Sequence, residues 1–253
     1  MNNRSAALAA VLLAAAAAQA RSQAVELRFK PVVGQVSHYT MVNQVWMGGD
    51  TSAAPMQSTM YQTRTVTAMD GANFVVKTVT DSTVMPAGSP GAGRDMMRGM
   101  GVTQTMDARG HILKTEVTPP PGLPPFVANM MTRNNQQGNS NRGQITWPEG
   151  PVSPGYTWTD TIVQSGGGGG RGARPTTVTF VATYKFERIE RQAGARVAII
   201  SMNGKGEGDV NATIAGEFAV DLDAGRPLHM VMNISMPMGG ATGVSRMTMS
   251  LQP

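Results

Sequence analysis

The chain has 253 residues, among them 30 glycines, 16 prolines, 20 methionines and no cysteine. The absence of thiols in this sequence excludes a disulfide scaffold, a cysteine zinc site, an iron–sulfur protein and a thiol enzyme. A formal net charge of +5, with 41% hydrophobic and 15% charged residues, excludes a disordered polyelectrolyte. The remaining class is a folded globular protein, and the composition does not indicate its biochemical activity.

The first twenty residues, MNNRSAALAAVLLAAAAAQA, have the features of a secretory signal peptide. Arg4 precedes an apolar stretch at 6–18, which is shorter than the roughly 20 residues that a membrane-spanning helix needs. The AQA triplet that ends at Ala20 fits the small-x-small cleavage rule, and cleavage after Ala24 is the alternative. We therefore expect residues 1–20 to be a signal peptide and the protein to be periplasmic or secreted, in a bacterium. Because lipoprotein export needs a cysteine, we expect neither a lipid anchor nor, from the later segments, a membrane span.

Residues 21–253 are predicted to form a single β-rich domain. Runs of Val, Thr and aromatic residues end at Gly, Asp, Asn or Pro at the spacing of β-hairpins, and helical periodicity is nearly absent. The predicted strands are Val25–Lys30, His38–Met47, Met60–Met69, Asn73–Met85, Val102–Asp107, His111–Val117, Thr176–Ile189, Arg196–Met202, Asp209–Asp223, Leu228–Met238 and Ser245–Leu251.

This order of strands predicts a mainly β fold, a curved antiparallel sheet or half-open β-barrel made of two meanders with one short central helix. The first meander covers 25–117, a helix and loop segment covers 118–153, and the second meander covers 154–253. The helix is predicted at Pro124–Arg133, where proline stands at the first turn and apolar residues recur. Similar turn markers recur in both halves, which indicates two meanders of one plan within one domain.

Methionine is concentrated on one face of the last predicted hairpin. Alternate residues of a strand point to opposite faces, so Leu228–Met238 has one face made only of Leu, Met and Ile. A turn at Gly239–Gly243 would join this face to the methionines of the last strand. Met is over-used on surfaces that adapt to varied apolar partners, whereas a rigid core favours Val, Ile and Leu. The predicted ligand-binding residues are Met230, Met232, Ile234, Met236, Met238, Met247, Met249, Phe126 and Met130, with Met41 and Met106 as further candidates.

Two other interpretations of the methionines remain open. They could belong to an ordinary core, or thioether clusters could bind Cu(I). The strand-located pairs also follow from period two alone, and His229 is the one histidine near them. We predict no cofactor, with a Met-rich Cu(I)-binding periplasmic protein as an alternative. The clusters are Met96-Met97-x-x-Met100, Met236-Pro237-Met238 and Met247-Thr248-Met249.

Catalytic motifs do not assemble in this sequence, so we expect no enzyme. His38, His111 and His229 have none of the spacings that metal sites use, and no G-x-S-x-G elbow is present. The run GKGEG at 204–208 lacks a βαβ context and predicts a hairpin turn. Thinly spread arginines and 13 aromatic residues indicate that nucleic acid is not a partner.

The order of features resembles a known layout. A D-x-x-G turn at Asp107–Gly110 precedes a strand, a proline-flanked helix follows, and a G-Y-x-W run at Gly155–Trp158 begins the second meander. This resembles an exported bacterial family of uncharacterised function that is similar in shape to the periplasmic lipoprotein carriers (LolA/LolB-like). The resemblance implies a half-open β-barrel whose apolar concave face shelters acyl chains.

We therefore expect an exported bacterial envelope protein that binds a lipid or lipidated partner in a concave sheet lined with methionine. The alternative is a structural or interaction module of the cell envelope with a solidly packed interior. Its partner surface would then lie in the Gly/Arg-rich loops at Ser89–Gly101 and Ser165–Arg174.

Overall fold

The computed structural model describes most of the chain that follows the predicted signal peptide. Residues 1–23 lie outside the described residues, and so do some strand-end side chains, namely those of 163–166, 176–177, 237–238 and 241. The described ranges are 24–46, 48–86, 95, 97–129, 132, 145–166, 176–207, 212–238 and 241–253.

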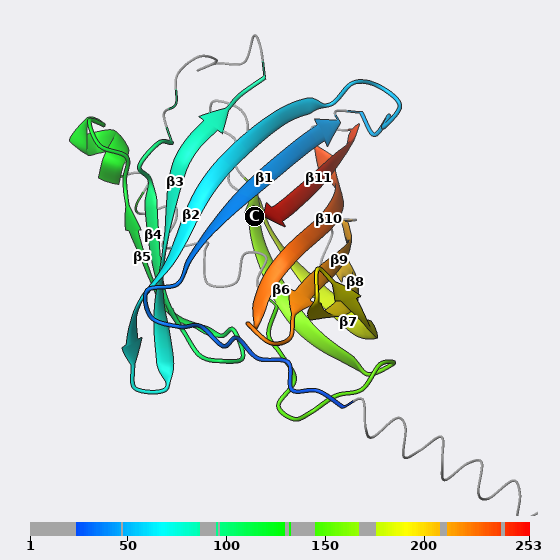
Figure 1. Cartoon of the computed structure of the whole chain (residues 1–253). Helices are drawn as coiled ribbons and strands as arrows, with labels where there is room; N and C mark the ends of the chain where they lie inside the picture. The colour runs from blue at the N-terminus through cyan, green and yellow to red at the C-terminus, as the bar shows by residue number, and fades with distance from the viewer. Residues whose placement is uncertain are drawn as a thin grey trace, which may run out of the picture.

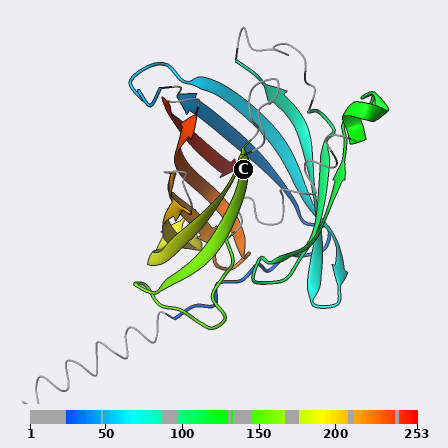
Figure 2. The same ribbon diagram turned by 180° about the vertical axis from the view of Figure 1, so that it is seen from behind.

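Eleven strands in these ranges form one antiparallel sheet, in the order β5-β4-β3-β2-β1-β11-β10-β9-β8-β7-β6. Strands β1 to β5 make the first meander and β6 to β11 the second, and the pairing of β1 with β11 joins them. The sheet is strongly curved and not closed, as Figures 1 and 2 show from opposite sides. The strands are β1 Val36–Trp46, β2 Met56–Asp70, β3 Asn73–Val84, β4 Gly101–Met106, β5 Ile112–Thr118, β6 Thr157–Gly166, β7 Thr176–Gln192, β8 Ala195–Gly206, β9 Thr213–Asp221, β10 Arg226–Met238 and β11 Ala241–Leu251.

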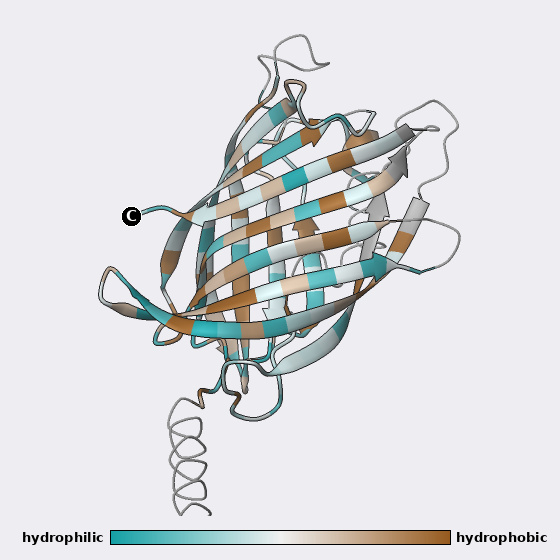
Figure 3. Ribbon diagram, turned by 90° about the vertical axis from the view of Figure 1, so that its right-hand side faces the viewer, coloured by the Kyte–Doolittle hydropathy of each residue, from teal (hydrophilic) through white to brown (hydrophobic). Residues whose placement is uncertain are grey.

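The predicted mainly β fold with a curved antiparallel sheet is confirmed, and the period-two alternation explains it. In β7, Phe180, Tyr184 and Phe186 are buried on the concave face, whereas Val181 and Lys185 between them are exposed. Figure 3 shows the same alternation as brown and teal bands along the strands. Removing one face of each strand from water therefore drives the sheet to curve around a core.

Two segments without regular strands close one end of the curve. The N-terminal segment, residues 24–35, contributes Leu27 and Phe29, and the crossing segment, residues 145–156, contributes Trp147. The Phe29 ring centroid lies 5.7 Å from that of Trp147 and 6.2 Å from that of Phe74 on β3. The two segments thus connect the apolar clusters of the two meanders.

The prediction of a β-strand at Val25–Lys30 is wrong. Val25 makes an isolated bridge with Val152, and Phe29 N–H donates to the Ala108 carbonyl at 2.9 Å, but no ladder forms. An extended segment that packs alternate residues on a core has the same period as a strand, so the pattern could not distinguish them. Conversely, β6 was not among the predicted strands.

A helical turn is present at 125–129, within the predicted helix, but its position differs from the expected one. It lies beside β5 at the periphery of the molecule (Figures 1 and 2), and Phe126 is 77% exposed. Leu27, Phe29 and Trp147 supply apolar packing where a central helix was expected. In the described ranges, no helix combines the length and apolar character needed to cross a lipid bilayer.

Gly225, in the turn between β9 and β10, lets the N-terminal segment approach this closely. Its φ is +62°, and a Cβ there would lie 2.4 Å from both the Arg28 carbonyl oxygen and the Lys30 nitrogen. Gly71, in the turn between β2 and β3, has a φ of +61° with nothing within 4 Å of a Cβ. A substitution at Gly71 therefore introduces backbone strain alone, whereas a substitution at Gly225 introduces backbone strain together with a steric clash.

We predict that Gly71→Ala lowers the free energy of unfolding by about 1–2 kcal/mol, the cost of a left-handed alanine. Gly225→Ala should lose about 1–3 kcal/mol more, because the new methyl group must displace the N-terminal segment. Urea unfolding followed by tryptophan fluorescence measures both values. Equal losses would contradict the close approach of the N-terminal segment to this turn.

Candidate functional site

A row of methionines crosses four neighbouring strands on the concave face of the sheet. Met60 on β2 is opposite Met41 on β1, which is opposite Met249 on β11, which is opposite Met230 on β10. Residues directly opposite on adjacent strands have Cβ atoms about 4.5–5.5 Å apart, so their side chains touch. These four residues are the methionine row. On β9 the next residue in register is Phe218, in the main core.

The register row two residues further along changes character where the two meanders meet. Met232 on β10 is opposite Met247 on β11, but the next partners are Asn43 on β1 and Ser58 on β2. The concave face is therefore apolar on the second meander and becomes more polar on the first.

Two adjoining cavities lie against this face. The first, of about 220 Å³, is lined by Met41, Met230, Met247 and Met249, with Phe29 and Trp147 also at its wall. The second, of about 320 Å³, is lined by Met41, Met60, Met232, Ile234 and Met247, with several polar residues. Met41 and Met247 border both cavities, which we together call the methionine hollow. Small-molecule pockets have volumes of about 300–1,000 Å³, so the hollow is of ligand-binding size.

The structure brings together most of the residues predicted on the last hairpin. Met230, Met232 and Ile234 are buried, and partly buried Met247 and Met249 complete the wall. Met236 is partly buried against the main core and does not line the hollow.

The prediction that Phe126 lines the ligand site is wrong. Its exposed side chain lies on the peripheral helical turn and not at the hollow. Met130 and the side chain of Met238 lie outside the described residues. Met106, a further candidate, is buried in the separate cluster of the first meander, with Val66, Phe74 and Val76. The hollow therefore takes most of its lining from paired strands, with Phe29 and Trp147 added by the two segments without regular strands, and the helical turn at 125–129 is not part of it.

Sequence reasoning missed the contribution of β2. Its inward-facing residues Met60, Gln62 and Arg64 alternate in the sequence, and this signal could have found them as one face. Their place in the same hollow as residues of β10 and β11 depends on the pairing of β1 with β11, because β1 lies between β2 and β11. No local pattern announces such a long-range pairing.

Arg64 places a positive charge at the hollow. Its Nη2 donates to Met106 Sδ at 3.7 Å, and its side chain lines the 220 Å³ cavity together with Gln62. Burial lowers the pKa of the Arg64 guanidinium, and the nearby Tyr39 opposes that shift. A guanidinium stays protonated in proteins, so this side chain remains a cation and a hydrogen-bond donor.

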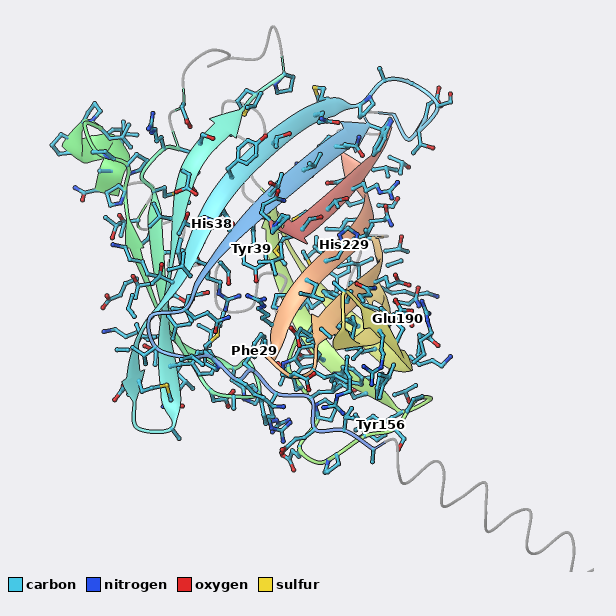
Figure 4. The ribbon with its side chains drawn as sticks, viewed as in Figure 1. Phe29, His38, Tyr39, Tyr156, Glu190 and His229 are labelled. Atoms are coloured by element: carbon cyan, nitrogen blue, oxygen red, sulfur yellow. The ribbon has the colours of Figure 1, made fainter. Side chains whose placement is uncertain are left out.

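Tyr39, labelled on β1 in Figure 4, lies with Arg64 in the wall of a small cavity next to the hollow. Its hydroxyl donates to the Pro227 carbonyl at 3.2 Å, and burial raises its pKa although Arg64 and Arg226 pull in the opposite direction. A cavity of about 40 Å³ is lined by these residues and by Phe29. The charged side chains Arg64 and Arg226 thus gather at one end of the site.

The histidines lie apart from the hollow and from one another. His38 Nδ1 is 3.0 Å from Thr63 Oγ1, His229 Nδ1 is 2.9 Å from Ser250 Oγ, and His111 Nδ1 is 2.6 Å from Asp107 Oδ2. Across the described ranges, no group of three or more His, Asp or Glu side chains could hold a metal ion. The Cu(I) alternative, which uses thioethers, stays a prediction.

We predict that oxidation by dilute hydrogen peroxide separates the methionines by burial, because susceptibility follows exposure. Met56 and Met69, 52% and 50% exposed, should become sulfoxides well before Met230 and Met232, which are each 5% exposed. Peptide mass spectrometry over a time course measures each rate. Similar rates at Met56 and Met232 would show that the wall is open to solvent.

Comparison with known proteins adds no relative to this geometry. A scan against protein-family models finds no match, and no curated protein matches the chain. The resemblance to the periplasmic lipoprotein carriers therefore stays a prediction, and function has to be inferred from the hollow itself.

Proposed function

We propose that this is an exported bacterial envelope protein that binds an apolar ligand, a lipid or lipidated partner, in the methionine hollow. The observation that carries the proposal is the methionine row, which lines two adjoining cavities instead of filling them. Unbranched, polarisable Met side chains adapt to the shape of a flexible chain. The leader-like residues 1–20 support a periplasmic or secreted location.

Burial of hydrocarbon supplies the driving force for this binding. Each methylene removed from water contributes about 0.8 kcal/mol, so ten of them contribute about 8 kcal/mol. The loss of ligand freedom and the ordering of methionine side chains oppose this gain. The proposed activity is reversible binding of the ligand, without catalysis.

A second candidate is an interaction module of the cell envelope, and the edge strand β5 favours it. Among the described strands β5 pairs with β4 alone, and Leu113 on it is 59% exposed. A free strand edge is a template for pairing with another chain. This surface is separate from the hollow, so the two candidates can be tested independently.

We predict that Met247→Trp abolishes or strongly weakens the uptake of Nile red, a neutral apolar dye. Met247 borders both cavities, so a larger side chain there fills space that the dye needs. Met69→Trp is the matched control, because exposed Met69 lies at the end of β2 outside the hollow. A fluorescence titration of wild type and both variants measures the affinities.

Near-ultraviolet circular dichroism of both variants tests whether the fold is retained. Equal uptake by the two folded variants would place the dye elsewhere and remove the support for the hollow. A wild-type protein that takes up no dye would favour the interaction module.

A further inference from the structure

One end of the methionine hollow carries the positive charge of Arg64, although the other lining residues there are mostly apolar. Along β2 the residues facing the hollow are Ser58 and Met60 at the larger cavity, then Gln62 and Arg64 at the smaller one. The hollow is thus polarised, with thioethers along its length and a guanidinium at one end.

Arg64 differs from three other arginines of the described ranges because it has no carboxylate partner. Arg109, Arg188 and Arg196 each pair with a carboxylate at 2.7–3.1 Å, at the surface. In the described ranges no carboxylate forms an ion pair with Arg64, and its side-chain contact is the sulfur of Met106. A thioether is a weak acceptor, so most of the guanidinium's five donors remain available. Arg64 is half-buried, and partial burial of a cation without a counter-charge costs free energy, which favours an anionic occupant.

The neighbours of Arg64 strengthen this asymmetry. Gln62 Nε2 donates to Met60 Sδ at 3.0 Å, again a weak acceptor that a better one could replace. Arg226, which lines the adjacent 40 Å³ cavity with Arg64, has a buried Nε without a hydrogen-bond partner among the described residues. Donor groups of Arg64, Gln62 and Arg226 at this end therefore lack a strong acceptor among the described residues.

We propose that the ligand is a long-chain fatty acid whose carboxylate binds Arg64 while its hydrocarbon chain lies along the methionine row. This inference rests on the proposed function and narrows its ligand class. The planar fork of a guanidinium matches the two oxygens of a carboxylate, and charge-assisted hydrogen bonds of this kind are the strong ones. Gln62 is placed to donate a further hydrogen bond from the same strand face.

The size of the hollow favours a single chain. Its cavities have volumes of about 220 and 320 Å³, one below and one just above the lower limit of about 300 Å³ for ligand pockets, which suits one acyl chain better than two. Arg64 lines the inside of the curve, where a carboxylate must enter the hollow to reach it. The recognised molecule is therefore a single fatty acid, and a bilayer surface would not reproduce the contact.

The test compares ligands that share a chain and differ in charge. Wild-type protein should bind palmitate at least about tenfold more tightly than hexadecanol, as expected for charged hydrogen bonds. Arg64→Gln should lower the affinity for palmitate to about that for hexadecanol and so remove the preference, while Arg64→Lys should keep part of it. Arg188→Gln, which removes a surface guanidinium that is 56% exposed on β7, is the matched control and should behave as wild type. Isothermal titration calorimetry measures palmitate and hexadecanol binding, and dye fluorescence measures Nile red.

The possible outcomes separate the two proposals. Binding of Nile red and hexadecanol with no preference for palmitate would overturn the fatty-acid assignment and leave the hollow as an apolar site. A preference for palmitate that survives Arg64→Gln would also overturn it. If wild type binds none of the three ligands, the proposed function itself fails. Because the wild-type comparison needs no variant, the assignment stays testable even if Arg64→Gln does not fold.

Discussion

The pairing of β1 with β11 is the contact on which the rest of the molecule depends. It is the one ladder that joins the two meanders in the described sheet, and it links residues 198 to 212 positions apart in the chain. Met41 and Met249 face each other across it, so the methionine row exists only because this ladder forms. Closing so long a loop costs conformational entropy, which the backbone hydrogen bonds of the ladder and the methionine contacts across it help to offset.

The two meanders contribute differently to packing. The second has a dense core in which Phe180, Phe186 and Ile200 are fully buried. The first has a small separate cluster around Phe74 and Met106, and Phe29 of the N-terminal segment packs against both clusters. The hollow lies where these two cores meet. A space between cores is more easily adapted than one inside a core, because interiors are packed at near-crystalline density.

The sequence predicted what depends on local alternation and missed what depends on distant contacts. Period two is enough to place Met230 and Met232 on one face of β10, and the structure keeps them there. The same period misassigned the segment at Val25, because an extended chain that packs against a core also alternates. Phe126 was attributed to the site because its helix was expected to be central, although Trp147 and Leu27 provide the apolar packing instead. Arg64 was overlooked, since only the pairing of β1 with β11 brings β2 to the hollow.

Arg64 connects the stability of the empty protein to its proposed ligand. It lies between the first-meander cluster at Val66 and the methionine hollow, where it is half-buried, so its charge is partly removed from water. An uncompensated charge in such a place destabilises the unliganded fold. An anion that binds there removes this penalty and also touches residues from both meanders. Ligand that binds the folded state alone stabilises it by mass action, and here the gain would fall on the seam between the two cores. The feature that weakens the empty protein is thus the one that would make its binding selective for an acid over an alcohol of the same chain length.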